Sequence, residues 1–206
     1  MMERLLFEML RAFQLSFSLN SEVLNITLLS LRVSGTAVFF GSLIGVPIGT
    51  ALGLSQFRGK KSLIYFVQLT LRSIVNTFMG VPPVVVGLVV YLLLSGSGPL
   101  GPLGLIYTPT AMIIAQLIMV VPIIVGITMS AVGSVEKAVR EKALSLGATG
   151  TQAAWMVLKE ARMGVLTAII AAFGAAISEV GGIMIVGGNA RWVTRTLTTA
   201  IVLETD

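Results

Sequence analysis

The side chains that usually carry enzyme chemistry are scarce in this sequence. It contains no cysteine and no histidine, which excludes thiolate nucleophiles, Cys/His metal sites and the Ser/His/Asp constellation. Asp and Glu together number only 9. Glu179 is the one acid well inside an apolar stretch, where an ionisable group is a candidate functional residue. We therefore expect no catalytic residue and no metal site, and we look for a role in binding or transport.

The composition indicates a protein that crosses a lipid bilayer. Hydrophobic residues make up 55% of the 206 residues and charged residues 11%, with a mean hydropathy of +0.96. A soluble domain has roughly a quarter charged residues. A helix needs about 20 apolar residues to cross the hydrocarbon core. The stretches of that length are 33–54, 74–94, 110–132 and 164–186. We expect an all-α integral membrane protein, with 1–206 forming a single transmembrane domain.

The charges between these stretches predict the topology. The first connection, 55–62, contains Arg58, Lys60 and Lys61, and the third, 133–162, is the longest and also basic. The second connection, 95–109, contains no charged residue. By the positive-inside rule the first and third connections face the cytoplasm. Topology also explains the net charge of +5 better than nucleic-acid binding does, because the basic residues form short clusters.

The two ends of the chain differ from the four apolar stretches. Residues 1–20 mix charged and apolar side chains without the pattern of a signal peptide, so we expect an amphipathic helix in the membrane interface. Residues 197–203 begin a new apolar stretch. We expect either that this stretch folds onto the outer surface or, preferably, that a further span is missing from the sequence.

The third connection has the punctuation of two short helices. Ser134 is a good N-cap, Glu136 suits the first turn, and Gly147 can take the left-handed conformation that ends a helix. Thr149 and Gln152 have the spacing of a capping box that opens a second helix. The first helix is too polar to cross the membrane and too short to be stable alone. It therefore lies either on the membrane face or against a partner protein.

Residues 141–147, Glu-Lys-Ala-Leu-Ser-Leu-Gly, resemble the EAA loop of permeases from ABC importers. Lys142 departs from that pattern, as does the segment 157–160, where the family has Ile-x-Leu-Pro. The resemblance implies that this helix is a coupling helix seated in a groove of a cytoplasmic ATPase. The coupling residues that it implies are Glu136, Arg140, Glu141, Ala143, Leu144, Gly147 and Ala148.

The segments 80–88, 159–162, 177–181 and 198–204 are similar to the molybdate/tungstate permeases, and most of all to the tungstate branch. This resemblance implies the type I importer fold, whose five or more core helices suggest that the last one is absent here. It implies a homodimer in the prokaryotic inner membrane, an ATPase dimer that binds ATP and Mg²⁺, and an extracytoplasmic solute-binding protein. The chain itself is expected to bind no cofactor. Alternatives are a permease for molybdate, sulfate or phosphate, a self-sufficient carrier or channel, and a membrane enzyme.

A pore for a tetrahedral dianion needs hydrogen-bond donors and close backbone approach rather than tight binding. The candidate pore and gate residues are Ser34, Thr36, Pro82, Pro83, Ser178, Glu179, Gly181, Gly182, Asn189, Arg191 and Arg195. Packing is the alternative for the small residues and for the proline interruptions, and membrane-interface anchoring is the alternative for the two arginines. We expect Glu179 to pair with Arg191 or Arg195, to be protonated, or to fix the gate or the dimer.

Overall fold

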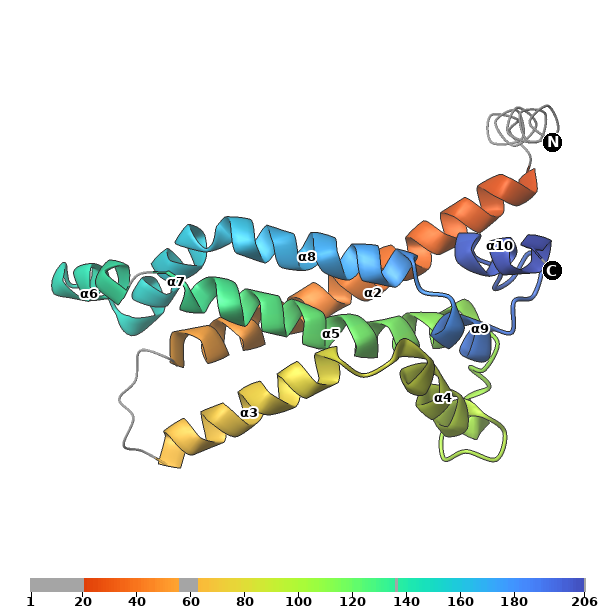
Figure 1. Ribbon diagram of the computed structural model, residues 1–206, viewed down its shortest axis with the longest axis horizontal. Helices are drawn as coiled ribbons and strands as arrows, with labels where there is room; N and C mark the ends of the chain where they lie inside the picture. Colours follow the sequence, from red (N-terminus) through yellow and green to blue (C-terminus); the bar gives the residue numbers. More distant parts are fainter. Residues whose placement is uncertain (1–20, 56–62, 136, 206) are drawn as a thin grey trace, which may run out of the picture.

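The computed structural model describes residues 21–55, 63–135 and 137–205, and every regular element in these ranges is a helix. The predicted helix of residues 1–20 and the basic residues of 56–62 lie outside them. The elements are α2 Ser21–Leu54, α3 Leu63–Met79, α4 Pro83–Leu94, η2 Gly101–Leu103, α5 Pro109–Gly133, α6 Lys137–Ser145, α7 Gly150–Glu160, α8 Arg162–Ile177, α9 Gly181–Gly187 and α10 Leu197–Thr205. Figure 1 shows an elongated bundle with α6 at one end and α9 and α10 at the other. The predicted all-α bundle is confirmed.

Two of the four apolar stretches are continuous helices and two are broken. Helices α2 and α5, of 34 and 25 residues, are each long and apolar enough to cross a membrane. Residues Phe66–Met79 and Pro83–Leu94 bend by 95° within the stretch 74–94, and the stretch 164–186 is interrupted between α8 and α9. A further bend, of 65°, joins α7 to α8 just before that stretch. Within the described residues there are thus two unbroken candidate spans, or up to four if each bent pair is one span. The membrane boundaries of the four stretches remain predictions.

The core of the bundle is the contact between α2 and α5. Gly41, Gly45, Gly49 and Gly53 recur every four residues along α2 and face α5. A Cβ atom on Gly49 would lie 2.7 Å from the carbonyl oxygen of Val125. Missing side chains therefore let the two backbones approach closely, as small residues do between membrane helices. The prolines of α2 and α5, Pro47 and Pro122, lie inside continuous helices.

The stretch 74–94 is not one helix, which corrects the continuous span expected there. Helix α3 ends at Met79, and α4 begins at Pro83 after a sharp turn. Pro82 has an extended backbone, φ −59° and ψ 132°, because the ring of the following proline disfavours the helical conformation of the residue before it. Pro83 starts α4, where its missing N–H has no cost.

The stretch 164–186 is broken as well, between Ile177 and Gly181. Its short second half, α9, packs on α4, the short second half of the other broken stretch. A Cβ atom on Gly87 of α4 would lie 2.5 Å from the Cα of Gly182. The two breaks thus meet at a glycine–glycine contact. At the same end of the bundle α10 joins α2, where the N–H of Leu197 donates to Ser30 Oγ at 2.9 Å.

The substitution Gly49→Ala should destabilise the bundle by about 1–3 kcal/mol, because the added methyl group meets backbone atoms that cannot rotate away. Gly35→Ala on the same helix is the matched control, since a Cβ there meets no atom within 4 Å. The midpoint of thermal unfolding in detergent should fall for Gly49→Ala alone. Equal midpoints for the two variants would contradict this account of the α2–α5 contact.

Candidate functional site

The turn between α6 and α7 has the geometry expected from its sequence. Gly147 has φ +85°, its N–H donates to the Leu144 carbonyl at 3.0 Å, and the Ala148 N–H donates to the Ala143 carbonyl at 3.1 Å. This pair of bonds is a Schellman motif, which needs the left-handed glycine. Thr149 and Gln152 form the predicted capping box at the start of α7. Both predictions about this turn are confirmed.

The predicted start of α6 is wrong in one respect. Ser134 ends α5 instead of capping α6, since its hydroxyl donates to the Ala131 carbonyl at 2.8 Å and its N–H donates to Ser130. A serine side chain can bond to nearby backbone groups at the start or at the end of a helix, so its presence alone does not tell which end it occupies. Helix α6 begins at Lys137. Glu136 lies outside the described residues.

The α6–α7 hairpin exposes large apolar side chains at the end of the bundle. Leu146 is 78% exposed and Trp155 is 65% exposed, whereas Ala143 is 2% exposed and supports the hairpin from inside. Among the other predicted coupling residues, Glu141, Leu144 and Gly147 are exposed, and Arg140 and Ala148 are half-buried. Sequence reasoning missed Leu146 and Trp155, although an apolar residue beside a helix-ending glycine was a usable signal.

The structure brings five of the predicted pore residues together where the two breaks meet. The Glu179 carboxylate accepts a hydrogen bond from the Gly182 N–H at 2.8 Å. A Cβ atom on Gly182 would lie 2.8 Å from the Pro83 carbonyl oxygen, and one on Gly181 would lie 2.5 Å from Val84. Pro82 precedes this contact at the start of α4. A cavity of about 150 Å³ next to it is mostly apolar and includes Glu179 in its lining.

Glu179 does not pair with Arg191 or Arg195, which corrects that expectation. Both arginines reach Glu22 at the start of α2, Arg191 Nε at 2.8 Å from Oε1 and Arg195 Nη1 at 3.6 Å. The hydrogen bond to Glu22 raises the pKa of Arg191 above its ordinary value. The arginines lie on the α9–α10 connection at the end of the bundle opposite α6 (Figure 1), whereas the Glu179 carboxylate bonds to the start of α9. Asn189, on the same connection, has φ +51° and donates to the Thr199 carbonyl at 3.2 Å.

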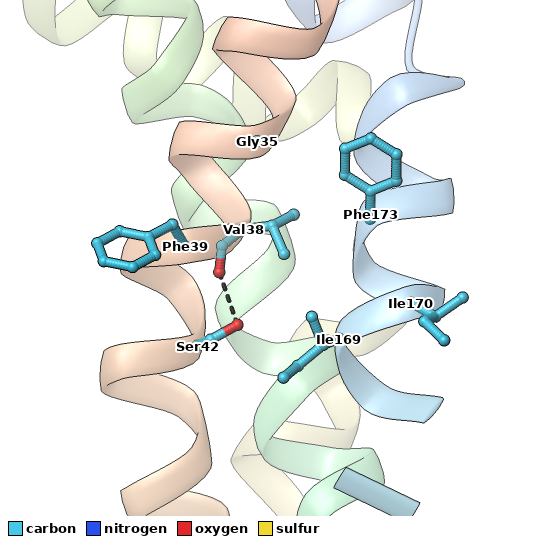
Figure 2. Close-up of a pocket in the computed structure, with 7 residues that line it drawn as sticks. All are labelled: Gly35, Val38, Phe39, Ser42, Ile169, Ile170 and Phe173. Carbon is cyan, nitrogen blue, oxygen red and sulfur yellow. Dashed lines mark hydrogen bonds between the residues drawn. The ribbon is translucent and has the colours of Figure 1, made fainter. Parts of the chain in front are cut away.

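Three further candidates do not join this junction. Ser34 is 2% exposed within α2, Thr36 is half-buried on the same helix, and the Ser178 hydroxyl donates to the Gly174 carbonyl at 2.8 Å. A cleft of about 450 Å³ between α2 and α8 is almost entirely apolar. In Figure 2 its one polar side chain, Ser42, donates to the Val38 carbonyl of its own helix at 2.7 Å. This cleft offers no free donor to an anion.

Two polar side chains that the sequence did not single out hold helix ends in place. Gln116 of α5 is completely buried, and its Nε2 donates to the Ala176 carbonyl near the end of α8 at 2.7 Å. Arg72 of α3 donates to the Leu52 carbonyl and to Ser55 Oγ at the end of α2, where a cation also complements the helix dipole. A lone glutamine in an apolar helix was the available signal for the first of these.

Comparison with known proteins places this fold in a family. Residues 45–203 match the model of the binding-protein-dependent transport system inner membrane component. A probable anion ABC transporter permease protein of Haloferax volcanii is 46% identical over 88% of this chain and 77% of its own length. Tungstate uptake system permease proteins TupB of Peptoclostridium acidaminophilum and Campylobacter jejuni are 38% and 36% identical, over 93% and 66% of this chain and 81% and 57% of their own lengths.

The chain therefore belongs to the family of inner membrane components of binding-protein-dependent ABC transport systems. The resemblance to the tungstate branch that the sequence motifs indicated is confirmed by these relatives. The chain is a transport subunit, and its apolar helices agree with a membrane location.

The substitution Glu179→Ala should lower the free energy of unfolding by about 1 kcal/mol, because the Gly182 N–H loses its acceptor where α9 begins. Glu179→Gln keeps a side-chain oxygen at the same reach and should retain most of the stability. Thermal unfolding of both variants in detergent measures the difference. Equal losses for Ala and Gln would show that the capping bond is not what Glu179 contributes.

Proposed function

We propose that this chain is the permease subunit of an ATP-driven importer for tungstate or a molybdate-like oxyanion. The assignment of the substrate rests on the similarity, at 38% and 36% identity, to two permeases named for tungstate uptake. An anion is also named for the Haloferax volcanii relative. An extracytoplasmic binding protein would capture the anion and deliver it to the outer end of the bundle, in the prokaryotic cytoplasmic membrane.

The α6–α7 hairpin supports the part of this proposal in which a partner ATPase supplies the energy. It extends beyond the long helices at one end of the bundle (Figure 1) and exposes Leu144, Leu146 and Trp155. Large exposed apolar side chains at a surface mark a site that a partner covers. We propose that the partner is an ATPase dimer that binds ATP and Mg²⁺, while this chain binds no cofactor and forms a homodimer. Nucleotide-driven closure of the ATPases would then push the two copies of α6 together.

The broken helices support a path for the anion. Backbone groups freed by a break within a membrane are tolerated where they are buried in protein or line a cavity, and here a cavity lies beside both breaks. The lining of this cavity is apolar except for Glu179, so it offers no tight binding site at which a dianion would be trapped. A binding protein that supplies the affinity makes such weak contacts sufficient. A permease for molybdate, sulfate or phosphate stays the alternative.

The substitution Leu146→Asp should reduce copurification of the ATPase at least about tenfold, equivalent to about 1.4 kcal/mol of binding free energy, because it places a charge in a desolvated contact. Leu103→Asp is the matched control: Leu103 is 60% exposed and lies in η2, between α4 and α5. Pull-down of candidate ATPase subunits by the two variants is the measurement. Retention of the ATPase by Leu146→Asp would contradict the coupling role of the hairpin.

Transport should favour tungstate over sulfate and phosphate, with molybdate the nearest competitor. The measurement is uptake of labelled tungstate, molybdate, sulfate and phosphate into vesicles that contain this chain, the ATPase and candidate binding proteins. Equal uptake of all four anions would contradict the tungstate assignment. Uptake that persists without the ATPase would favour a self-sufficient carrier.

A further inference from the structure

A second cleft, of about 400 Å³, opens on the half of the bundle nearer α6, and none of the pore candidates lies in it. We call it the α3–α8 cleft and define it by Asn76 and Met79 of α3, Ser130 of α5, and Thr167 of α8. Figure 1 shows α3 and α8 on either side of α5 in this half of the molecule. The cleft therefore lies between the coupling hairpin and the junction of the broken helices.

Two glycines allow the helices around this cleft to pack closely. Met79 lies against Gly126 of α5 so closely that a Cβ atom on Gly126 would collide with the Met79 sulfur. A Cβ atom on Gly164 of α8 would likewise collide with Ala131 of α5. Met79 also lines the apolar cavity beside Glu179. It thus lies between the α3–α8 cleft, whose mostly apolar lining includes the polar side chains of Asn76, Ser130 and Thr167, and the apolar cavity at the breaks.

The cleft contains hydrogen-bonding groups that the described part of the protein does not satisfy. The Asn76 amide and the Ser130 hydroxyl are exposed and make no hydrogen bond to any described residue. Thr167 differs, because its hydroxyl donates to the Met163 carbonyl at 2.9 Å. An unpaired amide facing lipid is strongly disfavoured, and polar groups within a span usually face a cavity or a partner helix. Asn76 and Ser130 are therefore available to a polar ligand.

The charges around the cleft favour an anion. No carboxylate is among its lining residues. Arg72 lies one helical turn before Asn76 on α3, and within the described residues it bonds to a carbonyl and a hydroxyl rather than to a carboxylate. Its positive charge is therefore not cancelled by an ion pair there. The same charge disfavours a cation on the amide and hydroxyl oxygens.

We propose that the α3–α8 cleft is a low-affinity site for a tetrahedral dianionic oxyanion, in which the Asn76 amide and the Ser130 hydroxyl donate hydrogen bonds. This inference rests on the proposed function and deepens it by locating a binding site on the path of the transported anion. Neutral donors in an open cleft bind a dianion weakly, and weak binding permits release. Arg72 contributes its field without contacting the anion, and Met79 covers the side toward the junction.

The test uses a single thiol, which is straightforward because the chain contains no cysteine. Ile127→Cys places the thiol in the cleft while leaving Asn76 and Ser130 intact. The reconstituted transporter complex is labelled with a small thiol reagent in sodium tungstate or in sodium chloride of equal ionic strength. Tungstate should slow labelling about threefold once it exceeds its dissociation constant about twofold, because about one third of the sites are then free. Leu103→Cys, outside the cleft, is the control and should label equally in both salts.

A second variant distinguishes a bound anion from other causes. Adding Asn76→Asp replaces a donor by a repelling carboxylate of nearly the same shape, and it should abolish protection of Ile127→Cys. Unchanged protection, or none in the parent variant, would overturn the proposal. So would a thiol that never reacts, since the cleft would then be covered by a second copy of the chain or by lipid. Tungstate uptake by the unmodified complex is measured in the same vesicles and tests the proposed function separately.

Discussion

The close approach of α2 and α5 is the constraint on which the rest of the structure depends. Gly41, Gly45, Gly49 and Gly53 remove every side chain from one ridge of α2, so that α5 rests on its backbone. Hydrophobic burial gives no net drive between helices in lipid, and van der Waals contact at short range has to supply the attraction. With this pair fixed, α3, α4, α8 and α9 all pack against α5. Side chains of α5 can then hold the two broken stretches, α3–α4 and α8–α9, in fixed positions relative to each other.

The breaks persist because their freed polar groups find partners nearby. Glu179 accepts from the Gly182 N–H, Thr198 Oγ1 donates to the Glu179 carbonyl at 2.7 Å, and Gln116 donates to the Ala176 carbonyl. Each bond satisfies a backbone group that an unbroken helix would have satisfied internally. The contact between Gly87 and Gly182 then packs the two short halves against each other. The junction is thus a stable irregular structure within an apolar bundle.

Local chemistry made part of this structure predictable from the sequence. Gly147 and the Thr149–Gln152 pair act within a few residues, and both gave the turn that was expected. The sequence did not show that the helix breaks at 80–83 but continues through Pro47 of α2 and Pro122 of α5. The break depends on two consecutive prolines and on packing against α9, which is distant in the sequence. An arginine partner was one of the three roles expected for Glu179, beside protonation and a contact at the gate or dimer, and its stretch was interpreted as one helix. Because the helix is broken there, the Gly182 N–H three residues later donates a hydrogen bond to the Glu179 carboxylate.

The helices also explain how a force on α6 could reach the junction. Helix α6 packs on α7, and Ala161 serves as the cap of both α7 and α8, so no loop separates these two helices. Val132, Val157 and Ala161 are buried together, which fixes the 65° bend against the end of α5. The far end of α8 is tied to Gln116 through Ala176, just before Glu179. A helix is stiff along its axis, so a displacement of α7 would be carried through this loop-free bend and along α8 to the junction, whereas a flexible loop in its place would absorb it.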